Sequence, residues 1–240
     1  MTRFQRYAIY VMPEGALARF GAHWLGWDPL SGCAVDYAAV DGLPRPLAEI
    51  TATPRKYGLH ATIKPPFRLA DGANLAGLMA DLAAVCDALD PVTLDALTLA
   101  RLGGFLALVP EGRADRLNAL AAAVVTRLDR HRAPLTEAEL ARRRAGGRLT
   151  PPQEAHLAQW GYPFVLEEFR FHITLTGHLP RKEAEAVATL LTPHLAPLLQ
   201  DPFVIASLCL MGEDEAGMFH LVHRYPLGAA ASRSSTATSA

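Results

Sequence analysis

Two short segments far apart in the chain repeat one alternating pattern, and this repeat constrains the fold more than any other feature. Residues 57–64 read YGLHATIK, and residues 169–176 read FRFHITLT. Successive side chains of a β-strand point to opposite faces, so each segment predicts a strand with one apolar and one polar face. On the polar faces, His60 stands beside Thr62 and His172 stands beside Thr174.

The same alternation assigns the neighbouring side chains to faces. Lys64 and Arg170 fall on the polar faces with the histidines, whereas Tyr57 falls on the apolar face, where core packing is the ordinary reading. Two interpretations of the polar faces stay open. They are either the wet side of an antiparallel sheet or the two halves of a phosphate site, which the absence of carboxylates beside the His, Thr and cationic residues favours.

Composition excludes several classes of protein. The chain has 240 residues, half of them hydrophobic, which is enough for a sizeable core. A formal net charge of −1 gives the whole molecule no strong attraction for nucleic acids or anionic membranes. Three cysteines form no pairable framework, and neither a signal-peptide pattern nor an apolar run of membrane-spanning length occurs. We therefore expect a reduced, cytoplasmic setting.

The order of patterns along the chain suggests a duplicated architecture. An amphipathic helical pattern and then a β-hairpin pattern follow each His/Thr segment, at residues 75–109 and again at 181–225. Capping-box signals at Thr136 and Thr150 predict two short helices in an insertion over residues 134–162. Residues 229–240 are small and polar without an apolar pattern, so we expect a disordered tail.

The two motifs resemble those of the 2H (two-histidine) phosphoesterase superfamily, the LigT-like proteins. The resemblance rests on LHATI at residues 59–63 and FHITL at 171–175. It implies a single α+β domain over residues 1–228, bilobal and pseudo-symmetric, with two antiparallel sheets facing a central cleft and helices outside. The longer string RKYGLHATIKPPF at residues 55–67 is similar to a bacterial branch associated with phosphonate degradation.

The resemblance also implies a reaction. The expected activity is a metal-independent cyclic phosphodiesterase without cofactor, acting on a small cyclic phosphate such as 5-phosphoribosyl 1,2-cyclic phosphate. His60 and His172 would be the acid and base, because histidine titrates nearest neutral pH. Thr62 and Thr174 would donate hydrogen bonds to the phosphate oxygens. The further candidates for substrate binding are Lys64, Arg170, Arg55, Lys56, Tyr57 and His178.

Three alternatives remain open from the sequence. One is an RNA-end enzyme acting on 2′,3′-cyclic phosphates or 2′–5′ linkages, which the near-neutral charge disfavours. Another is a phosphate-ligand binding module without catalysis. The last is a metalloenzyme using His60, His172 and His178, which lacks a neighbouring carboxylate ligand. The sequence decides neither which histidine is the acid nor the oligomeric state.

Overall fold

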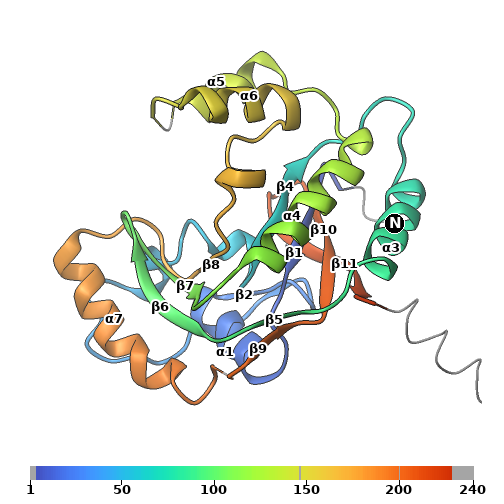
Figure 1. The fold of residues 1–240 in the computed structure, drawn as a ribbon. Helices are drawn as coiled ribbons and strands as arrows, with labels where there is room; N and C mark the ends of the chain where they lie inside the picture. Colours follow the sequence, from blue (N-terminus) through green and yellow to red (C-terminus); the bar gives the residue numbers. More distant parts are fainter. Residues whose placement is uncertain (1–3, 146, 200, 229–240) are drawn as a thin grey trace, which may run out of the picture.

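The fold is built on one seven-stranded antiparallel sheet. The computed structural model describes residues 4–145, 147–199 and 201–228 (Figure 1). In spatial order the strands are β11 (Phe219–Pro226), β10 (Ser207–Glu213), β1 (Arg6–Val11), β4 (Ala61–Phe67), β8 (Ile173–Thr174), β7 (Phe105–Pro110) and β6 (Leu97–Leu102). Two small two-stranded sheets accompany it, formed by β2 (Trp27–Asp28) with β3 (Cys33–Ala34) and by β5 (Val92–Leu94) with β9 (Phe203–Ile205).

Helices connect these strands. The α-helices are α1 (Gly15–Leu25), α2 (Leu47–Ile50), α3 (Leu75–Asp87), α4 (Asp115–Arg127), α5 (Glu137–Arg144), α6 (Pro151–Trp160) and α7 (Arg181–Leu195). Short 3₁₀ turns occupy Arg55–Tyr57, Asp129–His131 and Leu166–Glu168. No helix in the described part of the chain is long and apolar enough to cross a membrane.

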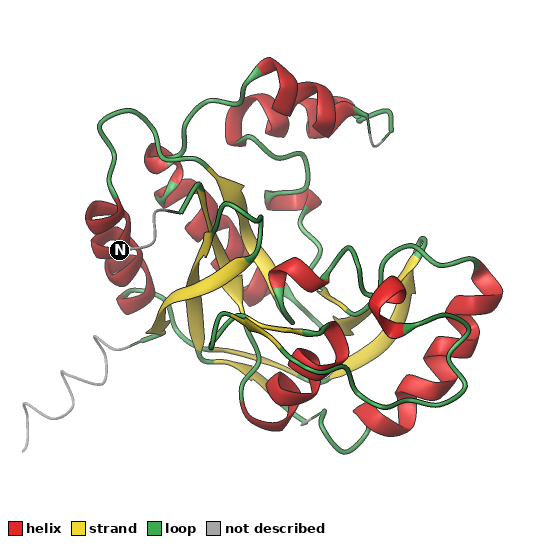
Figure 2. Ribbon diagram, turned by 180° about the vertical axis from the view of Figure 1, so that it is seen from behind, coloured by secondary structure: helices red, strands yellow, loops and turns green. Residues whose placement is uncertain are grey.

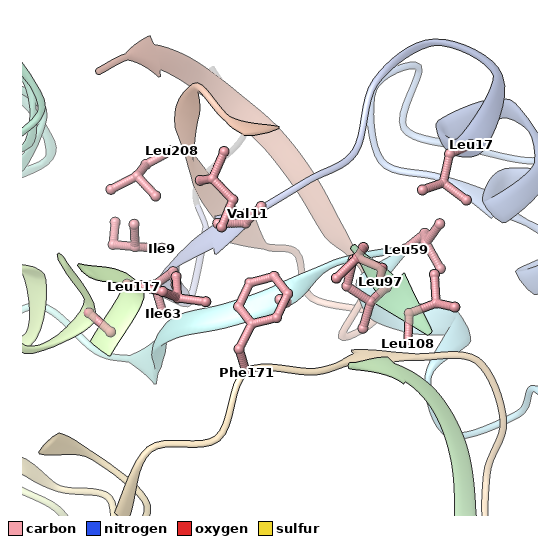
Figure 3. Packing of buried hydrophobic residues seen from close by; sticks show 14 of the residues in the cluster. Ile9, Val11, Leu17, Leu59, Ile63, Leu97, Leu108, Leu117, Phe171 and Leu208 are labelled. Carbon is pink, nitrogen blue, oxygen red and sulfur yellow. The ribbon is translucent and has the colours of Figure 1, made fainter. Parts of the chain in front are cut away.

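The main core lies on one face of the sheet. Strand residues such as Ile9 and Ile63, together with Phe171 just before β8, point to this face and pack against the buried sides of the helices (Figure 3). The opposite face of the sheet carries a smaller buried cluster around Tyr10 and Phe219. The two buried clusters therefore lie on opposite faces of the sheet, and Figure 2 shows the strands and the helices around them from behind.

The two expected sheets are joined into one. Within the described residues, β4 and β8 pair at Ala61 and Ile173, the centres of the two His/Thr motifs. The hairpins are also exchanged between the halves. The β6–β7 hairpin, which follows the first motif in the chain, pairs with β8, while the β10–β11 hairpin, which follows the second, lies beside β1 next to β4.

The motif strands are shorter than the alternation predicts. The first begins at Ala61 instead of Tyr57, because residues 55–57 form a 3₁₀ turn and Gly58 takes a positive φ of 70°. A side chain at Gly58 would be strained there, and its Cβ would clash with Pro29. The second strand keeps only Ile173–Thr174.

The predicted insertion forms the helical arm α5–α6, which extends away from the sheet at the top of Figure 1. Both capping boxes are present, with Thr136 capping α5 and Thr150 capping α6. Ion pairs fix the position of the arm. Arg68, which follows β4, pairs with Glu139 of α5 at 3.0 Å, and Arg132 donates to the carbonyl of Gln159 in α6 at 2.9 Å. The expected tail, 229–240, lies outside the described residues.

Candidate active site

The pairing of β4 with β8 places the two motifs side by side. Ala61 lies opposite Ile173, and both side chains are buried in the main core. Continuing this antiparallel register by one residue in each direction sets His60 across from Thr174 and Thr62 across from His172. Directly opposite side chains in such a pair are about 4.5–5.5 Å apart at Cβ. Four polar side chains therefore meet on the face of the sheet away from the core.

Both imidazoles are held by the same local hydrogen bond. His60 Nδ1 lies 2.9 Å from the Gly58 carbonyl oxygen, and His172 Nδ1 lies 2.8 Å from the Arg170 carbonyl oxygen. A carbonyl oxygen only accepts, so Nδ1 carries the proton and donates in each case. In a neutral ring this leaves Nε2 as the acceptor, and the Thr62 hydroxyl lies 3.2 Å from Nε2 of His60.

His60 is deeply buried. The Tyr10 ring lies 4.0 Å from its imidazole and the Tyr57 ring 5.4 Å away, measured between centroids. Burial away from water disfavours the charged form and lowers the pKa of His60 to about 4. The hydrogen bond to the Gly58 carbonyl opposes this effect, and the charge of His172 adds a smaller lowering. Near pH 7 the His60 imidazole is therefore neutral and able to accept a proton.

His172 stands in a more open place. Its side chain is half-buried, and its one aromatic neighbour among the described residues is Phe105, with 5.7 Å between ring centroids. The charge effect of His172 on His60 indicates that the two rings are close in space. The site thus holds one imidazole under aromatic cover and one at its edge.

The motifs open into a cavity of about 200 Å³, which we call the histidine pocket. Its lining residues are Tyr10, Thr53, Pro54, Tyr57, His60, Thr62, Pro65, Pro66, Arg143, Tyr162 and Thr174. His60 and both motif threonines face this space, and two lining residues come from the helical arm and the segment after it. His172 is not among the lining residues but lies across the strand pair from Thr62. One imidazole and two hydroxyls in a small pocket, with a second imidazole beside it, suit proton transfer to and from an oxyanion.

Tyr10, Arg143 and Tyr162 are among the lining residues that sequence reasoning missed. Tyr10 sits on β1, which pairs with β4, and its buried hydroxyl has no hydrogen-bond partner in the described part of the chain. Burial raises the pKa of this hydroxyl well above its usual value. Arg143 and Tyr162 enter from the insertion, with the guanidinium 4.7 Å from the ring centroid. Alternation around Tyr10 is typical of a strand, but nothing in the sequence places β1 beside the first motif.

Lys64 is not on the motif face, contrary to prediction. The register of β4 against β1 shifts near this residue, and the side chain turns into the protein, where it is 1% exposed. Its Nζ donates to Asp129 Oδ1 at 3.0 Å and to the Val125 carbonyl at 3.2 Å. Burial lowers the pKa of Lys64, although the Asp129 carboxylate opposes the shift. Lys64 ties β4 to the end of α4.

Two predicted arginines also point elsewhere. Arg170 is exposed, and its Nη1 donates to the carbonyls of Phe169 and Glu167 at 2.7 and 2.9 Å. Arg55 donates to the Tyr37 hydroxyl at 2.8 Å. Neither lines the histidine pocket. In both cases a nearby acceptor holds the guanidinium.

The remaining candidates divide between the pocket and the surface. Tyr57 lies on the histidine side, because the turn at Gly58 breaks the alternation that assigned it to the core face. Lys56 lines a neighbouring cavity instead of the histidine pocket. His178 is exposed, packs over Gly104 and does not line the histidine pocket. Within the described ranges, no three His, Cys, Asp or Glu side chains are grouped as metal ligands.

Comparison with known sequences gives one family and two curated relatives. A family model described as "Protein of unknown function (DUF1045)" matches residues 62–220. A protein of Janthinobacterium sp. (strain Marseille) named ribose 1,5-bisphosphate phosphokinase PhnN is 43% identical over 188 residues, covering 77% of this chain and 41% of that protein. One of the same name from Laribacter hongkongensis (strain HLHK9) is 34% identical over 223 residues, covering 88% and 49%. The chain spans less than half the length of each.

Solved structures similar to the chain include E. coli LigT. The complex with NADP+ is 14% identical with a TM-score of 0.44, and the complex with 3′-AMP is 12% identical with a TM-score of 0.42. Each comparison covers 94% of this chain and 99% of the other. The chemistry of the site rests on this chain's own residues.

Proposed function

The chain belongs to the DUF1045 family, and we propose that it is a phosphodiesterase that opens a small cyclic phosphate by two-histidine acid–base catalysis. The observation that supports this most strongly is the pairing of the two His/Thr motifs through Ala61 and Ile173. It brings two imidazoles and two hydroxyls to one face of the sheet, with both rings held through Nδ1.

In the proposed reaction His60 is the base. Neutral Nε2 of His60 takes a proton from water as the water oxygen forms a bond to phosphorus. The bond from phosphorus to one ring ester oxygen breaks, and protonated His172 donates its Nε2 proton to that leaving oxygen. The two histidines exchange their protonation states, and proton transfer through solvent restores them. The low pKa of His60 supports this assignment of roles, which the sequence alone left open.

Thr62 and Thr174 are proposed to stabilise the reacting phosphate. Their hydroxyls face the histidine pocket and can donate to the non-bridging oxygens, where negative charge grows in the transition state. The Thr62 hydroxyl is already oriented by His60 Nε2 at 3.2 Å and can turn from that nitrogen to a phosphate oxygen. A strained cyclic diester with a protonated leaving oxygen needs no metal for this step.

For the substrate we propose 5-phosphoribosyl 1,2-cyclic phosphate, in phosphonate breakdown. Breaking its phosphorus–O2 bond yields ribose 1,5-bisphosphate, the compound in the name of both curated relatives. Those relatives are more than twice as long as the matched segment, and the kinase name fits a portion outside it. None of the three lysines of this chain follows a glycine, so the chain has no GxxxxGK[ST] phosphate loop. The ring-opening step would supply the substrate of such a kinase.

Turnover followed by ³¹P NMR in the presence of EDTA tests this function. The compounds are 5-phosphoribosyl 1,2-cyclic phosphate and a 2′,3′-cyclic nucleotide. We expect the first to be converted to ribose 1,5-bisphosphate at full rate with the chelator present. Activity lost to EDTA and restored by Zn²⁺ or Mn²⁺ would contradict the two-histidine mechanism. Preference for the nucleotide would favour an RNA-end enzyme, and binding without turnover would favour a binding module.

A further inference from the structure

A second cavity adjoins the histidine pocket. It has a volume of about 270 Å³ and shares Tyr57, Pro65, Pro66 and Arg143 with the histidine pocket as lining residues. Its far wall is the helical arm, so the insertion separates this cavity from solvent on one side. A ligand reacting at His60 can therefore extend into this second space without leaving the protein surface.

Cationic side chains dominate the lining of the second cavity. Four of them have carboxylate partners and are neutralised at least in part: Arg6 with Glu213, Arg68 with Glu139, and Lys64 and Arg132 with Asp129. Three others, Lys56, Arg142 and Arg143, have no carboxylate partner in the described ranges. We call the cavity at these three residues the arginine pocket. Like charges grouped without counter-ions repel each other, and an anion between them relieves that repulsion.

The arm is built in a way that leaves these cations available. Glu139 both caps α5 through Thr136 and pairs with Arg68 below the arm. Arg144 pairs with Glu154 of α6 at 2.9 Å. The ion pairs that hold the arm thus use Glu139, Glu154 and Arg144, and not Arg142 or Arg143. Arg143 packs over Tyr162 and Arg144 pairs with Glu154, which distinguishes this run from a uniformly solvated face.

Arg143 stands at the boundary between the two cavities. It lines both, and its guanidinium packs over the ring of Tyr162, which also lines the histidine pocket. Stacking on an aromatic ring orients the planar guanidinium and leaves its edge free for a bidentate anion. Arginine matches the geometry of a phosphate in this way better than lysine does.

We propose that the arginine pocket binds a phosphate monoester carried by the substrate, through Arg143, Arg142 and Lys56. This inference rests on the proposed function, because it takes the cyclic phosphate to react at His60 and His172. The substrate class is then a small cyclic phosphate with a second, terminal phosphate. Two of the cations predicted from the sequence to bind substrate line this cavity, Lys56 and Lys64. Lys64 is paired with Asp129, so Lys56 is the one that belongs to the arginine pocket.

Substrate pairs with and without the terminal phosphate test the proposal. We expect kcat/KM of the wild type for 5-phosphoribosyl 1,2-cyclic phosphate to exceed that for ribosyl 1,2-cyclic phosphate by about a hundredfold or more. Arg143→Met and Arg142→Met should each lower the value for the phosphorylated compound about ten- to a hundredfold and leave the other compound nearly unchanged. Arg148→Met is the matched control, because Arg148 lies between α5 and α6 of the same arm, is exposed and lines neither cavity. It should change kcat/KM for neither compound.

Two outcomes would overturn the proposal. Equal losses on both substrates would place Arg143 at the reacting phosphate, and no loss on either would make the arginine run a solvated face. A binding measurement separates this failure from failure of the proposed function. Calorimetric titration with ribose 5-phosphate, with ribose as the control, requires no turnover. Binding of ribose 5-phosphate that Arg143→Met weakens about tenfold supports the pocket even if neither cyclic phosphate is hydrolysed, and equal affinities in both proteins contradict it.

Discussion

The two His/Thr motifs share their local structure and differ in what surrounds them. Each histidine donates from Nδ1 to the carbonyl two residues earlier, so both rings present Nε2 to the site. His60 lies under Tyr10 and Tyr57, whereas His172 is half-buried beside Phe105. The repeated motif thus fixes the tautomer and the orientation of each imidazole. The different aromatic neighbours determine how deeply each imidazole is buried. The pseudo-symmetric motifs supply a pair of imidazoles, and the departure from symmetry gives them different surroundings.

The strands on either side of the two motifs explain why the two histidines differ in burial. β4 has β1 as its other neighbour, and β1 contributes Tyr10 directly over His60. β8 has β7 as its other neighbour, and Phe105 at the start of β7 gives a looser contact. The helical arm also approaches the first motif, through Arg143 and Tyr162. The first half of the site is therefore enclosed, and the second half is open to solvent and substrate.

Removing either imidazole should have the largest effect on the proposed reaction. His60→Ala and His172→Ala should each lower kcat by about 10²–10⁴, the usual range for loss of a positioned acid or base. Both side chains face the site and not the main core, so circular dichroism and thermal melting should show intact folds. Should one folded variant keep a near-wild-type rate, its histidine has no role in the reaction.

The pH dependence of stability tests the difference in burial between the two histidines at His60. Its pKa is about 4 in the folded chain against 6.5 in the unfolded chain. Above pH 6.5 both states are neutral and nothing changes. As the pH falls below 6.5 the unfolded chain gains a proton that the folded chain refuses, so stability is lost until the folded imidazole titrates near pH 4. The loss amounts to about 3 kcal/mol.

Urea unfolding of the wild type and of His60→Gln at pH 7 and at pH 4.5 measures this effect. The glutamine variant should lose less free energy of unfolding across that interval, because its side chain does not titrate. Other titrating groups contribute to both proteins and cancel in the difference. Equal losses in the two proteins would show that burial does not lower the pKa of His60.

Short-range alternation predicted the central elements of the fold and the site. Leu59, Ala61 and Ile63 are buried as expected, and so are Phe171 and Ile173. Capping boxes also located both helices of the arm. These features depend on a few neighbouring residues, which is why the sequence reveals them.

Features that depend on contacts between residues far apart in the chain could not be predicted from the sequence. Alternation assigned Lys64 to the motif face, but a shift in register and the Asp129 carboxylate turn it inward. Tyr57 lies on the histidine side of the sheet and not on the predicted core face, because Gly58 interrupts the strand. The exchange of hairpins between the halves and the position of Arg143 arise from tertiary packing alone. The wrong assignments therefore concern the positions of the cations predicted to bind substrate more than those of the histidines.

Nitrogen-15 NMR of the imidazole rings tests most directly the claim that His60 is a neutral base with its proton on Nδ1. Spectra of wild type and His60→Gln, labelled at histidine, assign the His60 signals by their loss in the variant. The account predicts a protonated Nδ1 and an unprotonated Nε2 from pH 7 down to about pH 5, with titration only near pH 4. Titration of His60 near pH 6.5, or a proton resident on Nε2 of the neutral ring, would contradict it.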